Sequence, residues 1–213
     1  MATFGTLITK ASTRLKDANN TAVSRPDVAA TINDAISHWS DERFWFNEFQ
    51  ETVTLVQNDP ILPALSVTPL FLFDQGGIVI DYAQTRWPTR KVSSDEYDRM
   101  NVEGRGIPFA WTYRDGQYEL YWYPDAAYST IVRGVKAYTP FATDGSQDSQ
   151  SNDFTNEAAD LILYETLSRL FGEFRQDPKM EEYYANRALN EKAMLKTRTR
   201  RLVGTGRIQV EGF

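Results

Sequence analysis

The chain has 213 residues and a net charge of −6, and its 41% hydrophobic and 24% charged residues are typical of a globular protein. It has no cysteine, which excludes disulfides and thiolate metal sites, and its single histidine excludes a metal site built from several imidazoles. No apolar run approaches the roughly 18 residues of a membrane span, so we expect neither a membrane segment nor a signal peptide.

Two helices are predicted at the start of the chain. Apolar residues recur at helical spacing through residues 4–18, and the Asn19-Asn20 pair is expected to end this helix. The second helix is predicted over residues 26–42. Ser24 before it is a favourable N-cap, and Pro26 suits a first helical turn.

From Phe49 onward the apolar period changes to two, which indicates strands. The clearest signal runs from Phe109 to Tyr123, where two aromatic-rich segments flank Asp115-Gly116, a dipeptide favoured in tight hairpin turns. Further strands are expected at residues 52–56, 70–73, 78–80 and 130–136, with a short helix near 94–100.

Residues 143–153 are almost all polar or glycine and predict a linker loop with nothing to bury. Helical spacing then returns over residues 155–174 and 178–197, the last helix beginning at Asp177-Pro178.

Helices on both sides of a strand-rich middle predict an α+β fold, in which N- and C-terminal helices form a bundle with an inserted antiparallel β-domain. The expected parts are a bundle of residues 1–46 and 154–197, a β-domain of residues 47–142, the linker 143–153 and an extended C-terminal docking tail, 198–213.

The C-terminal segment is the most unusual part of the chain. From Lys192 onward it carries six basic residues and one acid, whereas the preceding residues carry 17 basic and 28 acidic ones. Cations suit the end of a helix, but core packing does not explain residues 204–213, which predict docking onto another chain, for example as an added strand. We expect residues 196–213 to be loosely held until a partner binds them.

No enzyme site is predicted, and neither a metal nor a cofactor is expected. Carboxylates adjacent on a helix diverge by about 100°, which separates the pairs Asp41-Glu42, Asp95-Glu96 and Glu181-Glu182. Gly204 and Gly206 lack the preceding strand and following helix of a phosphate-binding loop. His38 is expected on the flank of the second helix, beside Trp39.

Two other functions stay open. The first is a carbohydrate-binding tail module, because an aromatic ladder on a hairpin can stack ligands; its candidates are Trp111, Tyr113, Tyr118, Tyr121, Trp122 and Tyr123. Both faces of the hairpin carry aromatics, however, so at least one face belongs to the core. The second is a nucleic-acid-binding protein that uses the basic tail, whose affinity would fall steeply with salt.

Four passages, in this order, resemble the head-to-tail adaptor (connector) proteins of tailed, especially short-tailed, bacteriophages. They are Ile32-Asn33-Asp34-Ala35-Ile36 with the aromatics up to Phe46, residues 106–124 around the hairpin, residues 156–162, and residues 182–189. Together they span nearly the whole chain.

The resemblance implies a structural virion protein of the phage neck, assembled in the host cytoplasm. It implies a homo-oligomeric ring, usually of twelve copies, that binds beneath the portal protein, lengthens the DNA channel and carries the tail nozzle protein. DNA would pass without specific binding, as an acidic wall allows. Family members often grip the portal with C-terminal segments, which makes the candidate portal-binding residues Lys196, Arg198, Arg200, Arg201, Arg207, Ile208, Val210 and Phe213.

Overall fold

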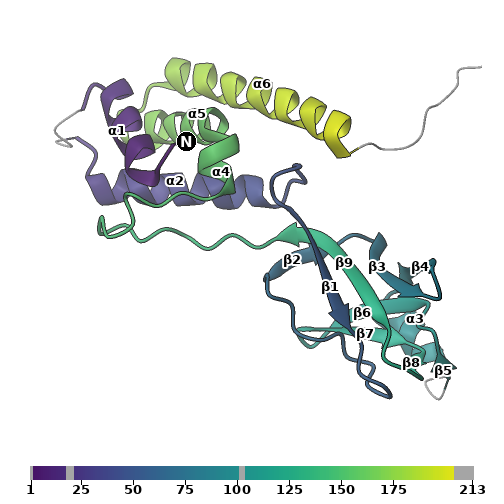
Figure 1. Ribbon diagram of the computed structural model, residues 1–213. Coiled ribbons are helices and arrows are strands. Elements are labelled where there is room, and N and C mark those ends of the chain that lie inside the picture. The colour runs from purple at the N-terminus through teal and green to yellow at the C-terminus, as the bar shows by residue number, and fades with distance from the viewer. Residues whose placement is uncertain (1, 18–21, 101–103, 204–213) are drawn as a thin grey trace, which may run out of the picture. The chain divides into compact units, whose positions relative to one another are not determined.

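The computed structural model describes residues 2–17, 22–100 and 104–203 (Figure 1). These residues form two compact units, one made of the chain up to Asn47 and from Tyr138 onward, the other of Glu48–Ala137. The first unit is helical and the second contains the strands. The predicted α+β fold, with terminal helices flanking a β-domain, is therefore confirmed.

The helical unit is built around one apolar core to which every long helix contributes. Its elements are α1 (Phe4–Arg14), α2 (Arg25–Ser40), α4 (Asp153–Glu157), α5 (Ala159–Leu170), the π-helical turn η1 (Phe171–Arg175) and α6 (Pro178–Val203). The predicted caps are present. Ser24 accepts a hydrogen bond from the Asp27 amide, and Asp177 accepts one from the Met180 amide at 3.2 Å.

Two helix ends differ from the predictions. α1 ends at Arg14 because the backbone turns left-handed at Lys16, where the buried Asp17 carboxylate accepts hydrogen bonds from the Ala22 and Val23 amides at 3.0 and 2.8 Å. α6 continues to Val203, six residues beyond the expected end. Apolar periodicity stops near Thr197, but the helix needs only backbone hydrogen bonds to continue.

The segment that returns from the β-unit has neither helix nor strand over residues 143–152, and none of its residues 143–153 is buried. It is nevertheless attached to the helices. Phe141 stacks on Phe4 with ring centroids 4.6 Å apart. The carbonyls of Asp148 and Gln150 accept hydrogen bonds from the first amides of α1, at 3.0 and 2.9 Å. The sequence hid this role, because main-chain carbonyls of any residue can cap a helix.

Asn33 of α2 holds the same segment. Its side-chain amide donates to the Phe141 carbonyl at 2.8 Å, and its carbonyl oxygen accepts from the Phe141 amide at 3.0 Å and from the Tyr138 hydroxyl at 2.6 Å. One side chain of α2 thus fixes the first residues after the β-unit.

The β-unit is a mixed sheet with the strand order β1-β9-β3-β4-β6-β7, and β2 also pairs with β9. The strands are β1 (Glu48–Thr54), β2 (Pro69–Leu72), β3 (Gln75–Tyr82), β4 (Thr85–Lys91), β6 (Ala110–Arg114), β7 (Gln117–Tyr121) and β9 (Ser129–Lys136); β5 (Arg105–Gly106) and β8 (Tyr123–Pro124) pair separately, and α3 spans Ser94–Arg99. All pairs in the main sheet are antiparallel except β4 with β6.

The Asp115-Gly116 turn is confirmed, since both residues have positive φ, 51° and 79°, and join β6 to β7. Strand β4 was not predicted, because Pro88 and three cations are unusual in a strand. β4 pairs with β6 only from Arg90 onward, so Pro88 needs no hydrogen-bonding partner on that side.

The β3–β4 turn is made of Ala83 and Gln84, with φ of 50° and 63°. A two-residue turn of this kind favours Asn-Gly, because side chains with a Cβ are strained at positive φ. We expect the double substitution Ala83→Asn/Gln84→Gly to raise the free energy of unfolding of the β-unit by about 1–2 kcal/mol. Urea unfolding followed by tryptophan fluorescence measures it. Asp115→Asn, at a turn that already has a favourable dipeptide, is the control; an unchanged double variant would contradict the strain.

Candidate functional site

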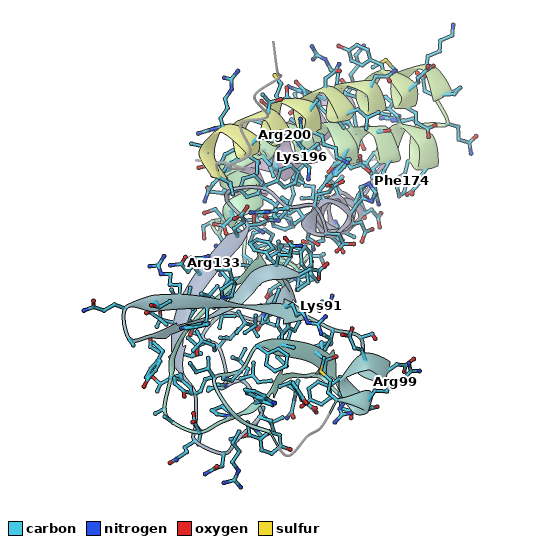
Figure 2. The ribbon with its side chains drawn as sticks, turned by 90° about the vertical axis from the view of Figure 1, so that its right-hand side faces the viewer. Lys91, Arg99, Arg133, Phe174, Lys196 and Arg200 are labelled. Carbon is cyan, nitrogen blue, oxygen red and sulfur yellow. The ribbon has the colours of Figure 1, made fainter. Side chains whose placement is uncertain are left out.

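The described candidate portal-binding residues lie on the last turns of α6. Lys196, Arg198, Arg200 and Arg201 are helical, so the expectation of an extended segment from residue 198 is wrong up to Val203. Figure 2 labels Lys196 and Arg200 on this helix. Arg207, Ile208, Val210 and Phe213, with the rest of residues 204–213, lie outside the described residues.

Two lysines of α6 share one carboxylate near the end of α2. The Lys192 and Lys196 ammonium groups lie 2.5 and 2.6 Å from the two Glu42 carboxylate oxygens. Lys196 also donates to the Arg43 carbonyl at 3.1 Å. Because the side chains are about two-thirds buried, this contact is screened less than a surface ion pair. It fastens the C-terminal half of α6 to the segment after α2.

The last turn of α2 and the segment after it offer an aromatic ring to each of three cations. The charged groups of Lys192, Lys196 and Arg198 lie 4.8, 5.0 and 4.4 Å from the ring centroids of Trp39, Phe44 and Trp45 respectively. These distances are within the range of cation–π attraction. Three of the basic residues therefore have a structural role, which the sequence did not reveal.

The exposed side of the same turns of α6 combines charge with apolar groups, and it includes Arg198, whose side chain is 60% exposed despite its contact with Trp45. A shallow hollow there is lined by Ala193, Met194, Thr197, Arg198 and Arg201. Met194 and Leu202 are each 58% exposed. Guanidinium groups beside exposed apolar side chains suit a protein partner that supplies carboxylates and apolar contacts.

The pKa of Glu42 provides a test of the α6 attachment. Hydrogen bonds from Lys192 and Lys196 lower this pKa below its ordinary value of 4.5. A lowered carboxylate pKa stabilises the fold above the ordinary value, and this contribution is lost as pH falls through the folded-state pKa. We expect Glu42→Gln to lower the melting temperature at neutral pH, and the difference from the parent protein to shrink below about pH 4.5. Glu182→Gln, at an exposed position on α6, is the control. A difference independent of pH would show that the ion pairs are not its cause.

The aromatic hairpin is divided between core and surface, since Tyr121 is buried whereas Tyr113 is 53% exposed. Trp111 is 1% exposed and packs inside the β-unit. Trp122 is partly exposed, but it lies against the backbone of Gly104, where a Cβ would stand 2.1 Å from the indole Cδ1 atom. Trp111 and Trp122 are the two tryptophans among the candidate stacking residues of the hairpin. The burial of Trp111 removes the first of these.

The described ranges contain no cluster of three or more acidic or histidine side chains placed to hold a metal ion. Among the helices described, none is long and apolar enough to cross a membrane. His38 is exposed and lies edge-on to Trp39, with ring centroids 4.6 Å apart, as expected.

Comparisons with known proteins agree with the resemblance noted in the sequence. A search of curated proteins finds no match. The family model of the SU10 adaptor protein, however, matches residues 2–210, which is nearly the whole chain and includes both units. This name denotes a structural component of a bacteriophage particle. The chain therefore belongs to the SU10 adaptor protein family.

Proposed function

We propose that this adaptor forms a ring, of twelve copies in keeping with the family resemblance, that joins the portal to the tail. The ring would extend the DNA channel and carry the tail nozzle protein in the neck of the particle, after assembly in the host cytoplasm. The family match over residues 2–210 is the observation that carries this proposal.

We propose that the portal contact lies at the C-terminal end of the chain. The Glu42 ion pairs and the cation–π contacts hold the C-terminal half of α6 in place as far as Arg198. Arg200 and Arg201 are exposed on the last turns of α6 and would pair with portal carboxylates. Ile208, Val210 and Phe213 would then fill apolar grooves of the portal.

The proposed DNA channel agrees with the charge of the chain. The residues before Lys192 carry 28 acidic and 17 basic side chains. An acidic wall repels the phosphate backbone, so DNA would slide past it without being held. The same charge does not favour the nucleic-acid-binding alternative, which would have to rely on the C-terminal cations alone.

Electron microscopy of the purified protein mixed with its portal tests the proposal. We expect a ring of added density on one end of the portal, and no such density on portals imaged without the adaptor. A second sample with duplex DNA in place of the portal separates the alternatives. DNA binding that weakens steeply with salt, with no density on portals, would replace the adaptor ring by the nucleic-acid function.

A further inference from the structure

The end of the β3–β4 hairpin exposes two aromatic side chains. Tyr82 and Trp87 are 50% and 49% exposed, and the exposed Arg86 stands between them in the chain, opposite Asp81 in the register. Tryptophan, tyrosine and arginine are the residues that most often dominate the energy of protein interfaces. The left-handed turn at Ala83 and Gln84 adds local strain of the kind that accumulates at functional positions. We call residues 82–87 the finger.

The other end of the same sheet carries an apolar groove of about 450 Å³. It lies between residues 61–69 and the β6–β7 turn, and its lining is Ile61, Leu62, Pro63, Ala64, Leu65, Val67, Thr68, Pro69, Tyr113, Gly116, Gln117 and Tyr118. No charged side chain lines it. The volume is in the range of sites that enclose a compact organic group. The exposed Asp115 is the neighbour of Gly116 at its rim.

The topology keeps the finger away from the groove of its own chain. β4 and β6 are parallel, and Arg90 is paired with Ala110. The finger lies five residues before that pair, at Thr85, and the β6–β7 turn lies five residues after it, at Asp115. At about 3.3 Å per residue the two are about 30 Å apart. A finger can therefore reach only the groove of another molecule.

We propose that the finger of one copy docks into the groove of the next copy, with Trp87 and Tyr82 against the apolar lining and Arg86 beside Asp115 at the rim. Such a contact joins two different surfaces, so it repeats head to tail and closes into a ring when the rotation allows. The inference rests on the proposed ring and names the contact that builds it. The occupant is a second copy because the finger supplies exposed aromatic groups and a cation, while the groove supplies an uncharged apolar lining and a rim carboxylate.

Cysteine cross-linking tests this contact directly, because the chain has no cysteine of its own. Thr85→Cys marks the finger and Gln117→Cys marks the groove, and both positions are exposed. With a short thiol cross-linker the double variant should give a ladder of three or more copies, both free at high concentration and on portals. Either single variant should give no cross-linked species and should run as a monomer on a denaturing gel. Dimers from Thr85→Cys alone would mean a two-fold finger-to-finger contact and would overturn the proposal.

Two further substitutions, made in the double-cysteine background, separate docking from misfolding. Trp87→Ala shortens the finger, and Ala64→Trp fills the groove without touching the finger. Each should reduce the ladder several-fold, while Asn186→Trp, at an exposed position on α6, should not. Far-UV circular dichroism checks that each variant is folded. Rings on portals without the ladder would disprove this contact and leave the proposed function standing. A ladder without portal binding would support the contact between copies and contradict the proposed attachment to the portal.

Discussion

A chain that ends at Val203 is expected to fold normally and to lose its attachment to portals. The truncation keeps all of α6 and the buried Leu195 and Thr199, which fix its C-terminal half in the core of the helical unit. It removes Arg207 and the apolar residues proposed to enter the portal. Because contacts of this kind repeat around a ring, their loss multiplies, and we expect binding to fall by at least about a hundredfold. Co-sedimentation of the adaptor with portals measures it.

Two pairs of substitutions in the full-length chain test whether the cations at the end of α6 contribute to portal binding. Arg200→Ala/Arg201→Ala removes two cations from the end of α6, and Lys10→Ala/Lys179→Ala removes two exposed cations elsewhere on the helical unit. The first pair should weaken portal binding and the second should not. If the truncated chain bound portals as tightly as the full-length chain, the portal contact would have to lie within residues 1–203.

Asn33→Ala is expected to destabilise the helical unit strongly. It removes three hydrogen bonds and leaves the Phe141 amide and carbonyl and the Tyr138 hydroxyl without this partner. Each buried polar group left unsatisfied costs about 1–3 kcal/mol, so we expect a loss of about 3 kcal/mol in the free energy of unfolding. Chemical denaturation measures it. Asn190→Ala, at an exposed position of α6, should change stability little, and an equal loss at both positions would contradict the role of Asn33.

The sequence predicted most elements where a local signal exists. Ser24 and Asp177 mark helix starts because a cap acts within one turn, and Asp115-Gly116 marks a hairpin because φ is set by the residue itself. Strand β4 was missed because its Pro88 is tolerated only through the sheet topology, which no local pattern encodes.

The candidate site was predicted less completely. The basic residues were recognised, but their division into structural and exposed cations was not, because the partner of Lys192 and Lys196 is Glu42, about 150 residues earlier in the chain. Such a pair can be found only once the fold brings the two segments together. The finger and the groove were likewise beyond local inference, since each depends on which side chains remain exposed after folding.

The pairing of β1 with β9 has a consequence for how such a protein can be rebuilt. The chain enters the β-unit at Glu48 and leaves it after Ala137, and Glu48 stands opposite Val135 in the register. Those two paired residues are about 5 Å apart, and the exit lies only two residues beyond Val135, so a short loop could replace the whole insertion. A helical unit with Asn47 joined to Tyr138 through a few glycines is a candidate for an independently folding module, and β-units from other family members could be exchanged at the same two junctions.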